Sequence, residues 1–331
     1  EGVSVVARKR LVLEGGSHSL DGLGAGDAPL VERIHRLQRE AEQEEGIDLE
    51  VIVYEGSSGR HRGVRPVSPA NEALPALIGT LNAAGIPFIF AMNGGLLHPE
   101  AVLPDESEVR VLDSMSACGL DSGLKNKVVI TRHALLPWLR RTYPSLEVVA
   151  SCVQQISPRE SRPYAAKLEN YDYVVPLNQH TTYDVLKDLR EHAGRLIVFL
   201  KLTCGMVDTR YCYSDYLSME KVPWETIVRQ LTTLPPGLLI PSGLTADDSG
   251  CNNPRSALIT REHDLAGLIR MGVCIFKVSR AQQLLPEEYR TLTRSIREHQ
   301  PEGLGGGSAA DPRPGRQEIP DASMAGLSGA S

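Results

Sequence analysis

Four cysteines have the positions that best suit a metal or redox site in this chain. Cys204 follows the apolar run RLIVFLK, Cys212 and Cys251 lie in the long segment after it, and Cys152 follows EVVAS. Thiolates from separate loops can hold an iron–sulfur cluster, whereas a zinc ribbon uses compact cysteine pairs. Cysteine is also among the most often buried residue types, so buried or incidental thiols are the alternative.

Polar side chains at the ends of apolar runs form a second set of candidates. Lys277 and Arg280 finish the last run, Glu55 ends the second, and His180 follows the sixth. A carboxylate near a lysine or arginine could bind an anionic substrate or exchange protons. Salt bridges that cap the fold are the alternative use of such residues. The other polar residues at these ends are Glu14, Asn93, His133, Gln154, Asn178 and Lys201.

These candidates need a parallel sheet to bring them together, and the sequence predicts one. Short β-branched runs alternate with amphipathic stretches, which is the βα pattern of a parallel sheet or barrel. Eight strands close a barrel, and barrels collect catalytic groups at the carboxyl ends of their strands. We therefore expect an α/β fold, a TIM-like (β/α)8 barrel. The predicted strands are 10–16, 49–56, 87–94, 127–131, 147–151, 173–177, 195–201 and 273–279.

Helices are predicted between the strands by apolar residues at helical spacing. Cys118 lies in a further helix-like stretch and Cys274 within the last strand, so both are predicted to be core residues. A run at 237–243 is interpreted as a short insertion that carries Cys251 over the barrel mouth. The predicted helices are 29–44, 71–84, 134–143, 182–191, 218–234, 261–271 and 286–298.

Composition limits the classes of function. The chain has 331 residues, 41% of them hydrophobic, so it can form a full core in one barrel domain over residues 1–300. Residues 301–331 are rich in Gly, Pro, Ala and Ser and are predicted to be a disordered tail. A net charge of −6 gives no strong nucleic-acid signal, because such binding needs a basic face.

Compartment and chemistry are limited in the same way. No apolar stretch reaches the ~20 residues that span a bilayer, and EGVSVVARKR lacks the apolar block of a signal peptide. We therefore expect a cytoplasmic protein that makes no membrane contact. A G-x-S-x-G elbow, an H-E-x-x-H pair and a dinucleotide fingerprint are absent from the sequence. Serine-hydrolase, zincin and nicotinamide chemistry are correspondingly disfavoured.

Three segments of the chain resemble the motifs of one known protein family. The C-terminal match is Cys251, then DLAGLIRMG (264–272), FKVSR (276–280) and PEEY (286–289). VITRHALLPWLRRTYPSLEVVAS resembles the strand, helix and short strand that precede a Ser-Thr-Gln turn in the family. That turn reads SCVQ here. A strand ending near paired cysteines, Cys204 and Cys212, is the third match. By these segments the chain resembles the collagenase-like peptidase family U32, and the likeness extends over most of residues 10–298.

The resemblance implies a TIM-like barrel and one of two activities. These are the peptidase activity that named the family, or oxygen-independent hydroxylation by iron–sulfur members that act on ubiquinone precursors and RNA bases. Those members use four cysteines. Three of them are similar in role to Cys204, Cys212 and Cys251, and the other lies between the second and the last. This chain has no cysteine between Cys212 and Cys251. A 4Fe-4S cluster would therefore have an open iron or take Cys152 as its fourth ligand.

We expect an iron–sulfur hydroxylase, or a related modifying oxidoreductase, that acts on a small or aromatic molecule. A metal-free hydrolase of the peptidase type is the alternative, with Glu55, His180 and Lys277 as its candidate residues. A third hypothesis is a non-catalytic subunit that pairs with a second barrel protein. A homodimer is also compatible with the sequence.

Overall fold

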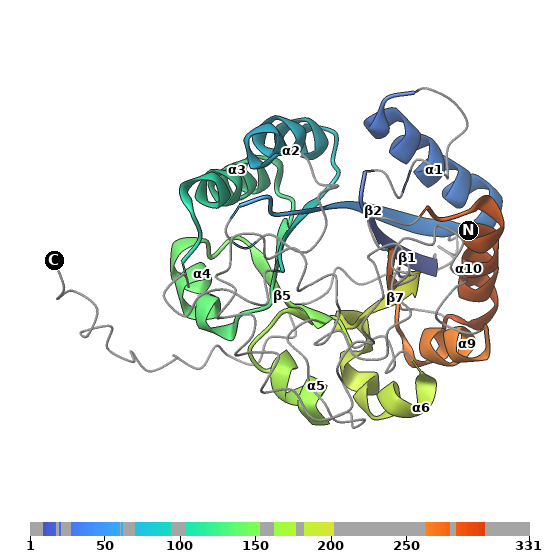
Figure 1. Ribbon diagram of the computed structural model, residues 1–331. Helices are drawn as coiled ribbons and strands as arrows, with labels where there is room; N and C mark the ends of the chain where they lie inside the picture. The colour runs from blue at the N-terminus through green and yellow to red at the C-terminus, as the bar shows by residue number, and fades with distance from the viewer. Residues whose placement is uncertain are drawn as a thin grey trace, which may run out of the picture.

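The computed structural model describes residues 9–17, 20, 28–59, 61, 70–93, 103–152, 162–176, 182–201, 262–278 and 283–301. Eight parallel strands form its centre, in the order β6-β5-β4-β3-β2-β1-β8-β7 (Figure 1). A parallel bridge between Val174 and Leu196 joins β6 to the start of β7 and brings the two edges of the sheet together. The strands are β1 (Lys9–Gly15), β2 (Ile47–Gly56), β3 (Phe88–Met92), β4 (Lys127–Ile130), β5 (Glu147–Ala150), β6 (Tyr173–Val174), β7 (Ile197–Lys201) and β8 (Ile275–Val278).

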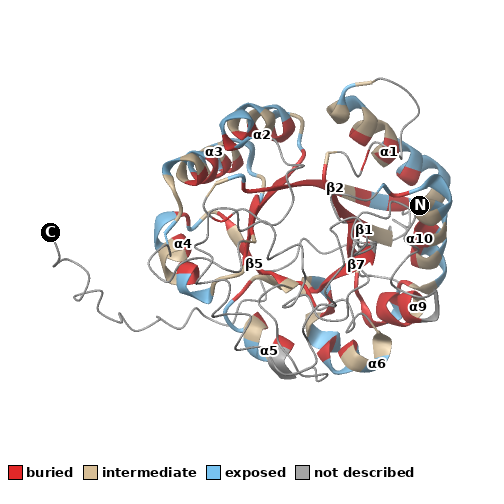
Figure 2. Cartoon of the chain, in the orientation of Figure 1, coloured by how far each residue is buried: buried red, intermediate tan, exposed pale blue. Residues whose placement is uncertain are grey.

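The strands are buried on both faces, which explains their nearly continuous apolar sequences. Leu11 and Leu13 of β1 pack outward in a large core that includes helix residues. Val12, between them, packs in a smaller cluster whose members come from the strands and the segments next to them. Because side chains alternate along a strand, this smaller cluster is the barrel interior. Figure 2 shows the buried strands ringed by helices with exposed outer faces.

Helices surround the strands and pack their apolar faces on the outer core (Figure 1). α1 ends where Gly46 adopts a left-handed conformation with φ of 65°, which glycine tolerates best. α3 begins with a capping box, in which Asp105 and Glu108 each accept a hydrogen bond from the backbone N–H of the other. The helices are α1 (Leu30–Glu45), α2 (Leu74–Ala83), α3 (Glu106–Ser122), α4 (Leu136–Thr142), α5 (Arg162–Leu168), α6 (Tyr183–Leu186), α9 (Glu262–Met271) and α10 (Pro286–His299). Short 3₁₀ segments cover Asn71–Ala73, His133–Leu135 and Lys187–Arg195.

The predicted TIM-like barrel is confirmed, with all eight strands present. Predicted strand ends agree within two residues, except that β6 ends at Val174 rather than at residue 177. Pro176 lacks an N–H, so it cannot continue the ladder beyond Val175, which still donates to Ala150 O at 3.0 Å. Cys274 lies just before β8 rather than within it. α3 was expected only as a helix-like stretch around Cys118, and α5 was not predicted.

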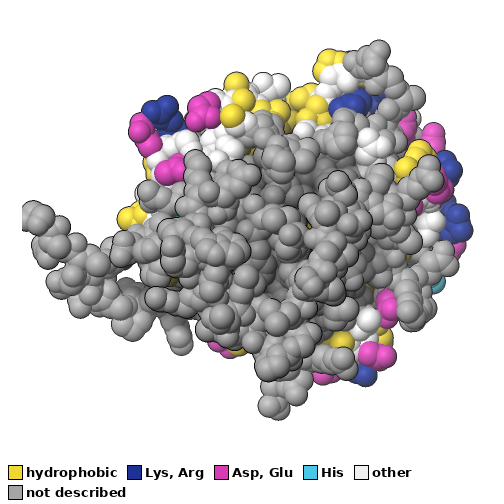
Figure 3. All heavy atoms as spheres, in the orientation of Figure 1, with side chains coloured by type: hydrophobic (Ala, Val, Ile, Leu, Met, Phe, Trp, Pro, Cys, Tyr) yellow, Lys and Arg dark blue, Asp and Glu magenta, His cyan; other side chains and the backbone are white. Residues whose placement is uncertain are grey.

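Several predicted segments lie outside the described residues: the helix at 218–234, the run at 237–243 and the tail, of which only Pro301 is described. Among helices in the described ranges, none combines the length and apolar character needed to cross a bilayer. Figure 3 shows acidic and basic side chains interspersed along the visible edge of the molecule where the chain is described.

Candidate functional site

Three charged side chains meet inside the barrel, and we call them the interior charge group: Glu14, Lys127 and Lys277. Glu14 on β1 and Lys277 on β8 are direct cross-strand partners. Lys127 begins β4, on the other side of β2 and β3. Each lies two residues from a member of the cluster inside the barrel, on the same strand. The pairs are Glu14 and Val12, Lys277 and Ile275, and Lys127 and Val129. Strand alternation therefore directs all three charges into the barrel.

Glu14 lies between the two lysines. Lys127 Nζ donates to Glu14 Oε1 at 3.4 Å, and Lys277 Nζ lies 3.9 Å from Oε2. The exposed fractions are 0% for Glu14, 4% for Lys127 and 3% for Lys277, so all three charges are removed from bulk water. Glu14 Oε2 receives no hydrogen bond from any residue that the structure describes. This oxygen can accept a hydrogen bond from a bound molecule or water.

The electrostatics of Lys127 follow from this arrangement. Burial acts to lower the pKa of Lys127, but the carboxylate of Glu14, with smaller contributions from Tyr173 and Glu147, raises it overall. Lys127 is therefore a cation over the whole physiological range. The interior charge group therefore holds the Glu14 carboxylate close to two buried ammonium groups.

Aromatic rings complete the surroundings of the lysines. Lys277 Nζ lies 3.4 Å from the centroid of the Tyr54 ring and 5.8 Å from that of Phe199. Lys127 Nζ lies 4.1 Å from the centroid of the Tyr173 ring. Ring faces stabilise ammonium groups by cation–π attraction. Asn93, just after β3, donates from Nδ2 to the Tyr54 hydroxyl at 3.0 Å and so holds that ring in place.

Cys152 lies at the carboxyl edge of the barrel, directly after β5, and packs against the interior cluster. Its thiol is not in a disulfide and is half-buried. Lys167 of α5 is close enough for electrostatic interaction: burial lowers the pKa of Lys167 to about 8, and the charge of Cys152 opposes that shift. Cys152 and Lys167 are therefore neighbours at this edge of the barrel.

The other two cysteines in the described ranges lie elsewhere. Cys118 is on α3, packed against the outer core, with its Sγ 3.9 Å from Ser114 Oγ. Cys274 precedes β8 at the amino end of the barrel, where burial raises the pKa of its thiol. Both cysteines were predicted to be core residues, and these positions agree with that prediction. Both lie away from the carboxyl edge, where Cys152 is.

The predicted site residues are distributed unequally. Lys277 lies in the interior charge group, whereas Glu55 has the opposite parity on β2 and faces the helix layer. Glu55 Oε1 accepts from the Ser17 backbone at 3.1 Å and the Ser17 hydroxyl at 2.6 Å. Cys204, Cys212, Cys251, His180 and Arg280 lie outside the described residues. Among the described side chains, no three of His, Cys, Asp or Glu gather as a metal site would require.

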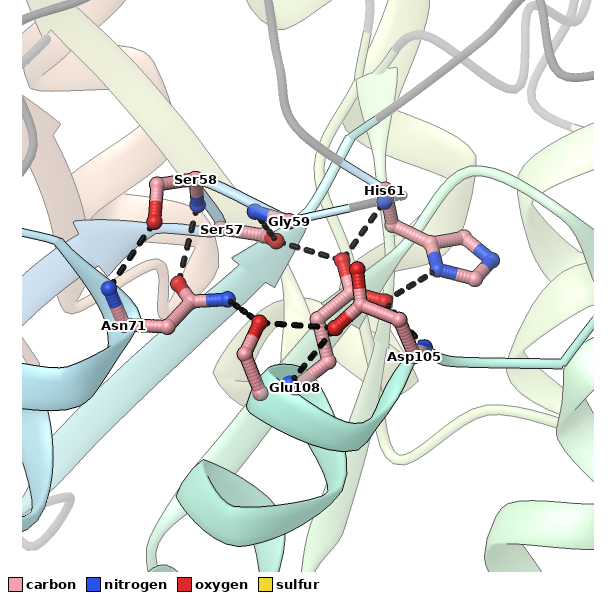
Figure 4. Close-up of polar contacts among 8 residues, drawn as sticks. Ser57, Ser58, Gly59, His61, Asn71, Asp105 and Glu108 are labelled. Carbon is pink, nitrogen blue, oxygen red and sulfur yellow. Dashed lines mark hydrogen bonds and ion pairs between the residues drawn. The ribbon is translucent and has the colours of Figure 1, made fainter.

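Sequence reasoning missed Lys127, which it treated only as the first residue of a strand. A signal was available, because a lysine that opens the apolar run KVVI is costly to bury unless it has a partner. It also missed Tyr54 and the buried pair of His61 and Glu108, whose Nδ1 and Oε2 atoms lie 2.8 Å apart (Figure 4).

Comparison with known proteins shows similarity to solved structures but not to known sequences. No family model matches the chain, and no curated protein matches it. A solved structure of a U32 peptidase is similar at 13% sequence identity and a TM-score of 0.42, over 84% of this chain and 95% of that one. The activity in that name belongs to the matched protein.

Proposed function

We propose that this chain is a U32-like barrel enzyme whose reaction centre lies above the interior charge group. The observation that carries the proposal is Glu14, buried between Lys127 and Lys277 with one oxygen that no described residue donates to. Apolar side chains of similar size would fill a barrel at least as stably as buried charges do. Charges held in such a place are candidates for function, and active sites of barrels lie at the carboxyl ends of the strands.

The interior charge group supports binding of a small molecule with an anionic or strongly polar group. The Lys277 ammonium would balance the negative charge, while Glu14 Oε2 would accept a hydrogen bond or a proton from the same molecule. The Tyr54 ring, which lies against the Lys277 ammonium, adds an aromatic surface. An aromatic or similarly compact substrate fits this combination.

For the cofactor, we propose an iron–sulfur cluster held by Cys152, Cys204, Cys212 and Cys251. Cys152 fits that role because it follows β5 at the carboxyl edge, is not in a disulfide, and lies near the barrel interior. When bound, such a cluster supplies one-electron chemistry for hydroxylation or a related modification of the substrate. The interior charge group would position the substrate and exchange its proton.

Metal and sulfide analysis of protein purified without oxygen tests the cofactor. We expect iron and acid-labile sulfide near cluster stoichiometry, and a large loss of both in Cys152→Ser. Cys118→Ser is the matched control, because Cys118 is a half-buried cysteine on an outer helix and should leave both contents unchanged. Wild-type protein without iron and sulfide would refute the cluster.

A metal-free hydrolase is the second candidate, and the interior charge group favours it because a buried Glu–Lys pair exchanges protons without a metal. Gelatin hydrolysis, assayed on the protein with all four proposed ligand cysteines replaced by serine, separates the two functions. Activity that survives in this variant and disappears in Glu14→Gln identifies the hydrolase. Activity lost with the cysteines contradicts it.

A further inference from the structure

Two polar side chains follow neighbouring strands of the barrel, and we call Asn93 and Thr131 the edge pair. Asn93 comes directly after β3, and Thr131 comes directly after β4. Met92 and Ile130 are cross-strand partners, and Thr131 N still donates to Met92 O at 3.4 Å. The two strands therefore remain joined where they end, which places Asn93 and Thr131 side by side at the carboxyl edge.

Both side chains of the edge pair face the inside of the barrel. Asn93 lies two residues beyond Ala91, and Thr131 lies two residues beyond Val129. Ala91 and Val129 belong to the cluster inside the barrel, and side chains alternate along a strand. Asn93 Nδ2 also donates to the hydroxyl of Tyr54, another member of that cluster, at 3.0 Å. The edge pair is therefore the next layer of the interior toward the carboxyl edge.

The edge pair has two buried oxygens that lack hydrogen bonds. Asn93 Oδ1 and Thr131 Oγ1 are both buried, and neither forms a hydrogen bond with any residue that the structure describes. Glu14 Oε2 in the interior charge group is a third such oxygen. Nearly all buried polar groups in folded proteins find a partner, and each exception needs an explanation. Three exceptions on the inner face of one barrel indicate that a bound molecule supplies the partners.

Tyr54 connects the edge pair to the interior charge group. Its hydroxyl accepts from Asn93, and the centroid of its ring lies 3.4 Å from Lys277 Nζ. Asn93 and Thr131 are half-buried, whereas Lys277 is only 3% exposed. The edge pair therefore lies nearer to the surface than the charges do. A molecule that approaches the charges from the carboxyl edge meets the edge pair first.

The chemistry of the edge pair selects the group that it can bind. Asn93 Nδ2 donates to Tyr54, so the unpartnered side of the amide is Oδ1, which only accepts hydrogen bonds. A carboxylate has no hydrogen to donate to it. An ammonium group has hydrogens, but the interior charge group already contains two lysines and one carboxylate, so a further cation is repelled. A neutral group with an N–H or O–H fits best.

We propose that the edge pair determines the specificity of the site and that it binds a neutral carboxamide group of the substrate. The carboxamide N–H donates to Asn93 Oδ1, and its C=O accepts from the Thr131 hydroxyl, so both buried oxygens gain partners. This inference rests on the proposed function for the position of the substrate, above the interior charge group. A permanently buried water between the two oxygens is the competing account.

Benzamide and benzamidinium test the proposal, because the two probes have the same shape and differ in charge. Each probe is titrated against the full chain by ligand-detected NMR to give a Kd. We expect the wild type to bind benzamide more tightly than benzamidinium. Asn93→Asp replaces the amide by a carboxylate, so this variant should reverse the preference. A water that is never displaced would leave the two affinities independent of this substitution.

Thr131→Val removes the hydroxyl and keeps the shape of the side chain. This variant should weaken benzamide binding about threefold or more, as the loss of one hydrogen bond does. Its melting temperature should stay at or above that of the wild type, because the hydroxyl has no described partner to lose. Thr293→Val is the matched control. Thr293 is buried on α10, where its Oγ1 donates to Arg290 O at 3.2 Å, and its replacement should leave benzamide affinity unchanged.

The proposal is overturned if the wild type binds neither probe or binds benzamidinium at least as tightly as benzamide. An unchanged benzamide affinity in Thr131→Val overturns it as well. Glu14→Gln, titrated in the same way, separates this failure from that of the proposed function. Binding that is lost in Glu14→Gln but unchanged in Thr131→Val would keep the interior charge group as the site and exclude the edge pair. Binding that depends on the edge pair stands even if the protein contains no iron and hydrolyses no peptide.

Discussion

Replacement of Glu14 by Gln is the most direct test of the interior charge group. The substitution keeps the shape of the side chain and removes its charge, which leaves the cations of Lys127 and Lys277 buried without their carboxylate. Lys127 lies 3.4 Å from Glu14 Oε1, and Lys277 lies 3.9 Å from Oε2. Removing one partner of a buried ion pair costs about 3–5 kcal/mol. We expect Glu14→Gln to lower the free energy of unfolding at neutral pH by this amount.

An exposed ion pair provides the matched control. Arg297 Nη1 lies 2.8 Å from Glu45 Oε2, a shorter distance than either contact of Glu14. The side chains of that pair are 53% and 25% exposed, however, and water screens the attraction. Such pairs contribute roughly 0–1 kcal/mol, so Glu45→Gln should change stability little. Urea unfolding of the two variants beside the wild type measures both values.

The outcome that refutes the reasoning is a Glu14→Gln variant that loses no more stability than Glu45→Gln. A second comparison locates the cause: Glu14→Gln combined with Lys277→Met removes one of the stranded cations. If uncompensated charge is the source of the loss, the double variant should recover part of the stability lost in Glu14→Gln. A further loss in the double variant would instead point to packing.

Two further predictions concern the turn after β2 and alkaline pH. A Cβ at residue 59 would lie 2.7 Å from Asp105 Oδ2 and 2.8 Å from Glu108 Cγ, so Gly59→Ala should destabilise the fold by about 1–3 kcal/mol in urea unfolding. Gly79 is a helical position with open space around its Cβ, and Gly79→Ala should be neutral or stabilising by up to about 1 kcal/mol. Burial raises the pKa of Tyr173 to about 12 from 10, so its neutral form stabilises the fold below pH 10, and this contribution is lost as pH rises toward 12. Between pH 9 and 12 the wild type should therefore lose more stability than Tyr173→Phe does, by roughly 2–3 kcal/mol at most.

The strands were predictable because each is a short apolar run bounded by turn residues or by an amphipathic helix. The side of the barrel that a strand residue faces was not. Val51, Ile52 and Val53 are all buried, because both faces of a parallel barrel strand are covered. The alternation that reveals inside and outside in a half-exposed strand is therefore missing. As a result, Glu14 and Glu55 looked equivalent in sequence, although one faces the lysines and the other faces Ser17.

Partners distant in sequence were beyond the same reasoning. Glu14 and Lys127 are 113 residues apart, and His61 and Glu108 are 47 apart. Glu14 and Lys127 meet because the closed sheet sets the register between their strands, and His61 and Glu108 meet where the loop after β2 contacts the start of α3. The residues Asp105 to Glu108 could have been recognised, since Asp-x-x-Glu before an apolar helical run is a capping box. That pattern predicts the start of a helix, but it does not reveal that a histidine from another loop uses the same carboxylate.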